Sequence, residues 1–252
     1  ECFTMLEVIG IAEEENGRLP KLVQERKVDG IIVIGKMMDD YLQHLNTEAG
    51  IPVIYLDYYN GREASDSVIS NSYYGTYELT YYLYRMGHRK IAYIHGDDTS
   101  VSKNRLGSFY RTLQRLGIEE PDEYVRPSFY RDADLAGERT GELLDLKDPP
   151  TCILYPDDYA ALGGINEIRE RGLRIPEDIS VAGYDGINIA QVLEPKLTTL
   201  CQDTAAIGRI AAERLIELIE HPKTTVIEKY TVDGTLFKGA SVKTLYPSKN
   251  FK

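Results

Sequence analysis

The chain has 252 residues, of which 29 are Lys or Arg and 40 are Asp or Glu, so its formal net charge is −11 at pH 7. A chain this acidic repels the phosphate backbone of nucleic acids, which excludes it as a DNA-binding module in its own right. Hydrophobic residues make up 42% of the sequence, a share that excludes a disordered or fibrous protein and is sufficient for a buried core.

Short apolar segments that predict β-strands recur along the chain. They cover residues 31–35, 52–57, 90–96, 151–156 and 179–185, and a further strand is expected over 226–230. The apolar residues run continuously instead of alternating with polar ones. This pattern is typical of parallel strands that are covered by helices on both faces.

Amphipathic segments that predict helices lie between and after these strands. Apolar residues recur at helical spacing over 74–86, 106–116, 162–168 and 204–219. A glycine follows each of the first three segments, where it can end the helix in a left-handed conformation. The alternation of strand and helix predicts a doubly wound α/β fold with parallel sheets.

Acidic residues directly follow most of the predicted strands, and one basic residue stands close to them in the sequence. The acidic residues are Asp57, Asp97, Asp98, Asp157, Asp158 and Asp185, and the basic residue is Arg105. Ligands of open α/β sheets bind beyond the carboxyl ends of the strands. Carboxylates that accept hydrogen bonds and a guanidinium that donates them suit a neutral polyhydroxyl ligand and repel anions. Phe129 and Tyr130 are candidates for stacking on a ligand ring.

Most of these residues also have a purely structural interpretation. Asp158 and Asp185 each precede a predicted helix, where Asp is a preferred N-cap, and Arg105 could form an ordinary surface ion pair. The tyrosines between residues 73 and 84 are expected to serve packing.

The enzymatic alternative is a magnesium site formed by Asp97, Asp98, Asp157 and Asp185. No nucleophile or base accompanies these carboxylates in the sequence. The motifs of phosphate-binding loops, dinucleotide-binding folds, serine hydrolases and zinc proteases are also missing from it. We therefore expect no enzymatic activity, no metal and no cofactor.

Cysteine usage and hydropathy bear on where the protein functions. Cys2, Cys152 and Cys201 are odd in number and include no C-x-x-C pair, so they predict neither a disulfide framework nor a thiolate metal site. No apolar run approaches the ~20 residues that a bilayer-spanning helix requires. The expected location is the cytoplasm, with no membrane partner.

Four stretches together resemble the effector-binding core of the LacI/GalR transcriptional regulators. They are MGHRKIAYI at 86–94, RLGSF at 105–109, the segment 150–186 with its DDYAALG and VAGYDG motifs, and PKLTTLCQD at 195–203. The resemblance implies the type I periplasmic-binding-protein-like fold, in which three crossovers join two α/β subdomains and the ligand binds between them. It places the amino-terminal subdomain at 1–72 plus 200–227 and the carboxy-terminal one at 73–199 plus 228–252. The helix-turn-helix headpiece of the family, and the first strand and helix of its amino-terminal subdomain, are not found in this sequence.

The resemblance also implies which residues contact the ligand. By position, Asp57, Arg105, Asp157 and Asp185 match ligand-contacting places of the family, and Phe129 and Tyr130 are expected to be pocket walls. The family usually has Asn at the place of Asp157 and a second acid at the place of Gly186. The added charge at Asp157 favours an uncharged sugar over a phosphate or a nucleobase.

The expected function is that of a ligand-sensing domain in a bacterial regulator. The resemblance implies a small-molecule effector, here a sugar, a homodimer whose contacts include the helix at 204–219, and operator DNA bound through a headpiece outside this chain. The alternative within the same fold is the solute-binding protein of a sugar transporter.

Overall fold

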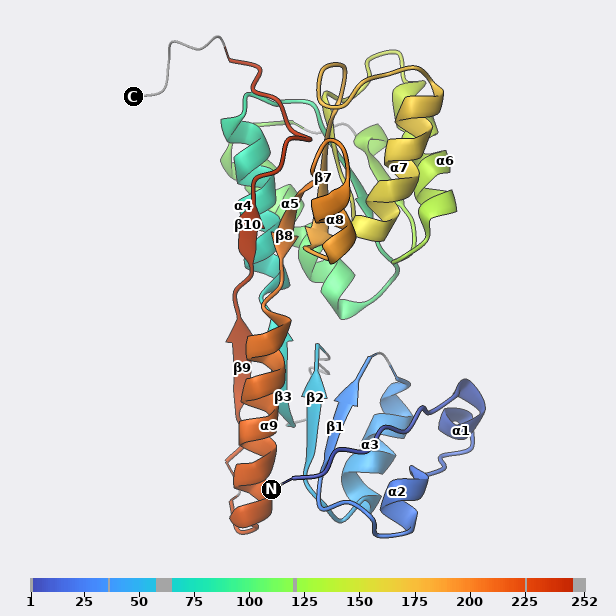
Figure 1. Ribbon diagram of the computed structural model, residues 1–252, viewed down its shortest axis with the longest axis vertical. Coiled ribbons are helices and arrows are strands. Elements are labelled where there is room, and N and C mark those ends of the chain that lie inside the picture. The colour runs from blue at the N-terminus through green and yellow to red at the C-terminus, as the bar shows by residue number, and fades with distance from the viewer. Residues whose placement is uncertain (1, 36, 58–64, 120–121, 225, 247–252) are drawn as a thin grey trace. The chain divides into compact units, whose positions relative to one another are not determined.

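The computed structural model describes residues 2–35, 37–57, 65–119, 122–224 and 226–246, and Figure 1 shows the path of the chain. The chain folds into two compact units, Glu1–Ser70 with Thr204–Val232 and Asn71–Asp203 with Asp233–Lys252. It therefore passes from one unit to the other three times, in agreement with the expected fold class.

The first unit holds a four-stranded parallel sheet in the order β1-β2-β3-β9. Its strands are β1 Ile31–Ile34, β2 Val53–Leu56, β3 Asp66–Ser70 and β9 Lys229–Val232, and its helices are α1 Ile11–Glu15, α2 Lys21–Gln24, α3 Asp39–Glu48 and α9 Thr204–Glu220. Tyr55 packs with α3 on one face of the sheet, and its neighbour Ile54 packs with α9 on the other. Because both faces are covered, neighbouring residues of one strand are both buried, as the continuous apolar runs predict.

The second unit holds a six-stranded sheet in the order β10-β8-β7-β6-β4-β5, in which only β10 is antiparallel to its neighbour. Its elements are α4 Ser72–Arg85, β4 Ile91–His95, α5 Ser100–Arg115, the 3₁₀ turn η1 Asp122–Tyr124, β5 Val125–Pro127, α6 Ala133–Leu144, β6 Cys152–Leu154, α7 Asp158–Glu170, β7 Ser180–Asp185, α8 Asn188–Val192, β8 Thr198–Cys201 and β10 Thr235–Phe237. Helices α4 and α5 cover one face, around Phe109, and α6 and α7 cover the other, around Ile165.

The third crossover differs from the expectation. Residues 228–232 lie in the first unit, because β9 pairs with β3. The buried guanidinium of Arg214 on α9 fixes this arrangement: its Nε donates to Asp66 Oδ1 at 2.7 Å, and its Nη2 donates to the carbonyl oxygen of Val226 at 2.5 Å. One side chain thus joins α9, the start of β3 and the segment that leads into β9.

Helices α6 and α7 pack backbone against backbone through glycine. A Cβ atom added at Gly163 would lie only 1.7 Å from the carbonyl oxygen of Ala133, whereas one added at Gly107 on α5 would meet no atom within 4 Å. No real Cβ atom tolerates the first distance, so α7 can approach α6 only with glycine at this position.

Replacing Gly163 by Ala is therefore expected to lower the free energy of unfolding by about 1–3 kcal/mol, because the two helices must separate. The matched control is Gly107→Ala, which is expected to be neutral or to raise stability by up to about 1 kcal/mol through helix propensity. Urea unfolding followed by circular dichroism measures both variants. Equal stabilities of the two variants would contradict the close contact.

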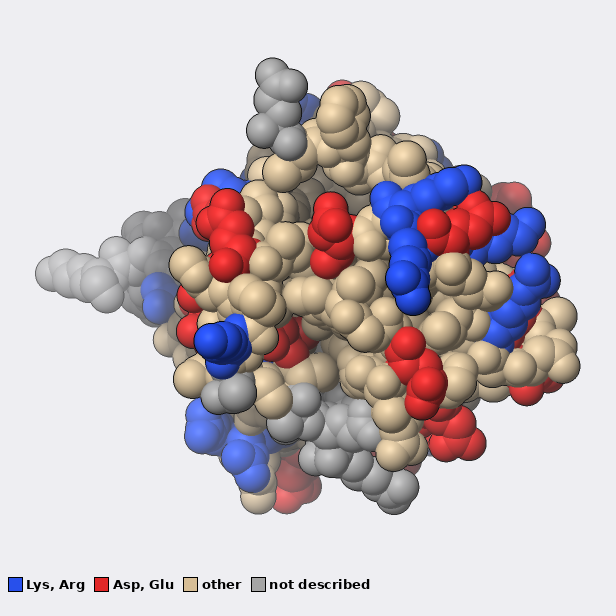
Figure 2. Space-filling model, turned by 90° about the horizontal axis from the view of Figure 1, so that it is seen from below, with Lys and Arg blue, Asp and Glu red and all other residues tan. Residues whose placement is uncertain are grey.

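Charge is dispersed on the face of the molecule that Figure 2 shows. Lys and Arg side chains lie among Asp and Glu side chains there, without a broad basic surface on the described part of this face. None of the described helices is long and apolar enough to cross a membrane.

Candidate functional site

Five of the six predicted ligand residues lie in the second unit, and Asp57 lies in the first. Asp57 follows β2 with a φ of +52°, and its Oδ1 accepts a hydrogen bond from the backbone N–H of Ser70 at 2.6 Å. This bond gives Asp57 a structural role at the end of the sheet. Its contact with a ligand stays a prediction.

Arg105 lies on the first turns of α5 and is only 3% exposed. Its Nη1 donates to the carbonyl oxygen of Pro156 at 2.8 Å, and its guanidinium lies 3.5 Å from the ring centroid of Tyr184. Its Nε is buried, and no described residue accepts a hydrogen bond from it. A buried guanidinium that is fixed in place and keeps an unused donor is suited to bind a ligand oxygen.

Asp185 ends β7 beside Arg105. Its Oδ1 accepts a hydrogen bond from Gln202 Nε2 at 2.6 Å and lies 3.8 Å from Arg105 Nη2, and no described residue donates a hydrogen bond to its Oδ2 in the structure. Burial raises the pKa of Asp185, and Arg105 and Gln202 partly offset this shift. Its φ of +100° is unusual for a residue with a side chain, and such strain is common where a side chain must be aimed at a ligand.

Asp158 stabilises the turn that follows Asp185 through hydrogen bonds. The two carboxylate oxygens of Asp158 accept hydrogen bonds from the hydroxyl of Thr199 at 2.6 Å and from the backbone N–H of Ile187 at 2.9 Å. Asp158 is fully buried, and burial raises its pKa to about 7. Asp158 therefore supports the turn that follows Asp185.

Asp157 is the N-cap of α7, whereas the sequence suggested Asp158 for that role. Its Oδ1 accepts from the N–H of Ala160 at 2.8 Å, and its Oδ2 accepts from the N–H of Arg131 at 2.7 Å. Arg131 has a φ of +60°, so Asp157 also stabilises a left-handed residue in the loop before α6. Both carboxylate oxygens are engaged by the backbone. A carboxylate bonded by backbone N–H groups keeps its charge, and this charge acts on Asp185, so the preference for a neutral ligand and a ligand contact of Asp157 both stay predictions.

Phe129 and Tyr130 occupy different environments in the loop between β5 and α6. Phe129 is 57% exposed, while Tyr130 lies over Arg105 with 5.6 Å between the guanidinium carbon and the ring centroid. Gly96 makes room for the Tyr130 ring, since a Cβ atom there would lie 2.5 Å from a ring carbon. Tyr130 thus forms a wall beside Arg105, and Phe129 is presented to solvent.

Comparison with known proteins gives this unit its context. A family model described as "Periplasmic binding protein-like domain" matches residues 80–242. The HTH-type transcriptional repressor PurR of Vibrio atlanticus (strain LGP32) is 31% identical over 241 residues, which cover 94% of this chain and 70% of that protein. The chain belongs to the LacI/GalR family. It spans between 60% and 70% of the length of the curated relatives it matches.

Solved structures of other transcriptional regulators share the fold. A transcriptional regulator CelR–cellobiose complex superposes with a TM-score of 0.82 at 28% identity, covering 92% of this chain and 71% of that one. A LacI family transcriptional regulator from Enterococcus faecium with bound ribose gives a TM-score of 0.78 at 28% identity, covering 90% and 83%. These relatives are regulators, so the comparison favours the regulator over the transporter alternative.

The sequence analysis does not single out two residues of this site, Tyr184 and Gln202, and it names Asp158 without its supporting role. Tyr184 stacks on Arg105, Gln202 holds Asp185, and Asp158 supports the turn between them. Gln202 follows β8, whose Cys201 is in register with Asp185. The strand-end rule would have found Gln202 if the segment 198–201, which contains two threonines, had been predicted as a strand.

The magnesium alternative requires four carboxylates in one place. Among the described residues, no three His, Cys, Asp or Glu side chains gather in a way that could hold a metal ion. Asp157, one of the four, is engaged by two backbone N–H groups. The structure therefore gives this alternative no support.

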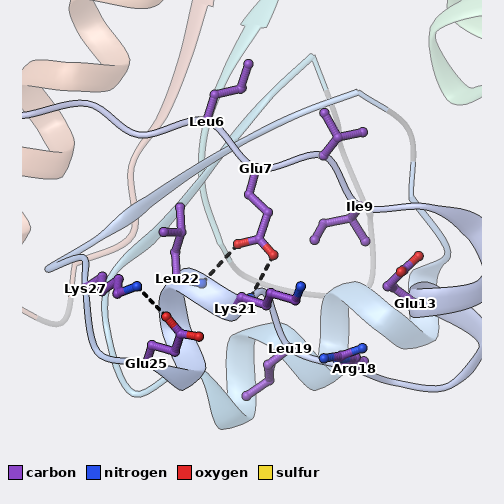
Figure 3. Close-up of a pocket in the computed structure, with 11 residues that line it drawn as sticks. Leu6, Glu7, Ile9, Glu13, Arg18, Leu19, Lys21, Leu22, Glu25 and Lys27 are labelled. Atoms are coloured by element: carbon purple, nitrogen blue, oxygen red, sulfur yellow. Dashed lines mark hydrogen bonds and ion pairs between the residues drawn. The ribbon is translucent and has the colours of Figure 1, made fainter.

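A separate hollow of about 380 Å³ lies in the first unit, beneath the segment Leu6–Ile9 (Figure 3). Its acidic side chain Glu7 points to the start of α2 and accepts hydrogen bonds from the backbone N–H groups of Lys21 at 2.8 Å and Leu22 at 3.0 Å. Glu25 and Lys27 pair with each other at 2.5 Å. The charged groups that Figure 3 joins by dashed lines are thus matched within the protein, and the hollow is not our candidate site.

Proposed function

We propose that the chain is the sugar-sensing domain of a bacterial transcriptional regulator and that a neutral sugar or sugar-like polyol binds at Arg105 and Asp185. The observation that carries this proposal is a paired donor and acceptor. Arg105 Nε is buried without a protein acceptor, and Asp185 Oδ2 receives no hydrogen bond from a described residue. A sugar hydroxyl both donates and accepts, so one or two adjacent hydroxyls could accept a hydrogen bond from Arg105 Nε and donate one to Asp185 Oδ2.

The surroundings of the pair agree with a sugar ring. Tyr130 and Tyr184 flank Arg105 with their rings, and aromatic faces pack against the apolar faces of sugars. Two structural relatives were solved with cellobiose and with ribose, which are both neutral carbohydrates.

The proposed mechanism is a shift between conformations. A sugar that binds one arrangement of the protein more tightly than another displaces the equilibrium towards it, typically with a coupling of about 1–3 kcal/mol. We further propose that the whole protein acts in the cytoplasm as a homodimer and binds operator DNA through a headpiece outside this chain. Because the headpiece would contact the DNA, the effector-binding chain of a DNA-binding protein can itself be acidic.

Isothermal titration calorimetry tests the proposal with pentoses, hexoses, disaccharides and the purine bases hypoxanthine and guanine. We expect at least one carbohydrate to bind and the purines to give no heat. Binding of a purine without any carbohydrate, or no carbohydrate binding at all, would overturn the assignment. Sedimentation velocity on the same samples measures the proposed dimer, which a monomer at all concentrations would contradict.

A further inference from the structure

A second hollow lies in the second unit, next to the Arg105 site. It has a volume of about 340 Å³, within the range of pockets that bind small molecules. Its walls come from the loop after β4, the start of α5, the end of β5 and the side of α6, and they include Asp97, Ser102, Ser128, Phe129 and Leu135. Of the predicted ligand residues, only Phe129 lines it.

Two polar atoms in this hollow are buried without a protein partner. Ser128 is 4% exposed, and its Oγ has no hydrogen bond to a described residue. The same is true of Asp97 Oδ1. Buried polar atoms in folded proteins are nearly always satisfied, and leaving one unsatisfied is costly. A hydroxyl and a carboxylate oxygen in one hollow therefore indicate a ligand that donates and accepts hydrogen bonds.

The other lining groups disfavour an anionic ligand. Lys103 is paired with Asp98 at 2.9 Å, and Arg139 donates to the carbonyl oxygen of Pro127 at 3.1 Å and is paired with Glu142. The cations of this hollow are thus already matched, while the carboxylate of Asp97 is not. An anion would be repelled, whereas hydroxyl groups can donate to Asp97.

Apolar side chains provide the remaining surface. Leu106 and Leu135 line the hollow and are partly buried, and Phe129, which also lines it, is 57% exposed. A solvent-exposed phenyl ring beside a free carboxylate and a hydroxyl suits a sugar ring, whose faces are apolar and whose edge carries hydroxyls.

The hollow and the Arg105 site share a wall. Ser102 lies one helical turn before Arg105 on α5, so both side chains are on the same face of that helix. The ring of Tyr130 lies against Gly96, which lines the hollow, and also over Arg105. A ligand with one ring at Arg105 could therefore extend past Tyr130 into the hollow.

We propose that this hollow is a second sugar subsite and that the effector is a disaccharide or another glycoside with two rings. The first ring is bound by Arg105 and Asp185, and the second ring stacks on Phe129 and donates hydroxyl groups to Asp97. This inference rests on the proposed function and names the class of sugar that the site accepts.

Calorimetry with glucose, ribose, cellobiose, maltose, lactose and sucrose tests the subsite. We expect at least one disaccharide to bind roughly tenfold more tightly than either monosaccharide, since a stacked ring adds to the contacts. Phe129→Ala and Asp97→Asn are each expected to weaken that disaccharide roughly tenfold and to leave monosaccharide binding unchanged. Phe3→Ala is the matched control, because Phe3 is 92% exposed and lies in the first unit.

The failures of the two proposals are distinguishable. If monosaccharides bind as tightly as every disaccharide, or if both variants bind the disaccharide like the unmodified chain, the subsite is wrong and the sensor assignment stands. If Phe129→Ala weakens both classes of sugar equally, Phe129 belongs to the first ring and the subsite is also wrong. If no sugar binds, the proposed function itself fails.

Discussion

Replacing Arg105 by Lys is expected to weaken sugar binding by about 100-fold or more. Lysine keeps the charge, but its donors all lie on one nitrogen, so it cannot donate to the Pro156 carbonyl oxygen from the place of Nη1 and also offer a donor at the place of Nε. It also loses the stacking contact with Tyr184. A hydrogen bond to a charged group is worth about 1.5–3 kcal/mol, and each 1.4 kcal/mol is a factor of ten in affinity.

The measurement is calorimetric titration with the best-binding sugar, combined with urea unfolding of the free protein. Arg111→Lys is the matched control, because Arg111 is exposed on the same helix. We expect this control to bind like the unmodified chain. Unchanged affinity in Arg105→Lys would place the sugar elsewhere.

The choice of Lys over Ala follows from the structure. Arg105 is buried and its Nη1 is bonded to Pro156, so removing the whole side chain would leave a buried carbonyl oxygen unpaired and a cavity behind. From the sequence alone, Arg105 is expected to be an exposed site residue, and Arg105→Ala would then reduce ligand binding without changing stability. With alanine, loss of binding and loss of stability could not be separated.

The sequence predicts those elements whose own residues show a clear hydrophobic pattern. Strands β4 and β7 are continuous apolar runs, and α4 and α5 have apolar residues at helical spacing with a glycine after them. Helix α6 was missed, because it packs on α7 through small residues and its Gly137 and Gly141 lower helix propensity. The place of β9 was also wrong, since it depends on the contact of Arg214 with Asp66, which are far apart in the sequence.

The sequence places several predicted site residues near one another but does not predict the contacts that each of them makes. The strand-end rule brings Arg105 and Asp185 to the same place, as the structure shows. The rule cannot tell that Asp157 is engaged by backbone N–H groups while Asp185 keeps an oxygen free, because that depends on the loop conformation at Arg131. Nor can it find the hollow at Asp97 and Ser128, which is formed by segments from both sides of the sheet edge.

Two buried groups in the second unit are expected to give opposite pH dependences of stability. Burial raises the pKa of Asp158 to about 7 from 3.8, with Asp185 adding to the shift. Burial lowers the pKa of His88 to about 4 from 6.5; the hydrogen bond to the carbonyl oxygen of Lys243 opposes this shift, and the positive charges of Lys243 and Arg89 add to it. His88 is fully buried between Thr151 Oγ1 at 2.9 Å and the carbonyl oxygen of Lys243 at 3.2 Å.

The sign of each effect follows from which state binds the extra proton. Between pH 3.8 and about 7 the folded protein holds a proton on Asp158 that the unfolded chain has lost, so this contribution to stability falls as pH rises. Between pH 4 and 6.5 the unfolded chain holds a proton on His88 that the folded protein lacks, so this contribution rises with pH. Each slope is about 1.4 kcal/mol per pH unit, and the two nearly cancel where the windows overlap.

Single substitutions should uncover the two slopes. Asp158→Asn resembles the protonated acid, because its Oδ1 can accept from Ile187 and its Nδ2 can donate to Thr199, so the fold is expected to persist. Its unfolding free energy, relative to the unmodified chain, should rise by about 4 kcal/mol from pH 4 to 7. His88→Gln should show the opposite trend from pH 4 to 6.5, and the double variant should follow the unmodified chain.

Urea unfolding at half-unit pH steps measures these differences, and subtraction of the unmodified chain removes the titration of the exposed carboxylates that all variants share. Differences of the same sign in both single variants would mean that one of the two groups is not buried in the assigned protonation state. If Asp158→Asn shows no trend with pH, Asp158 is ionised across the range.

In that case a permanent charge on Asp158 would support the turn at Asp185, and sugar affinity should not change between pH 6 and 8. If Asp158 titrates as assigned, the supporting carboxylate loses its proton within that range, and the affinity should change with it.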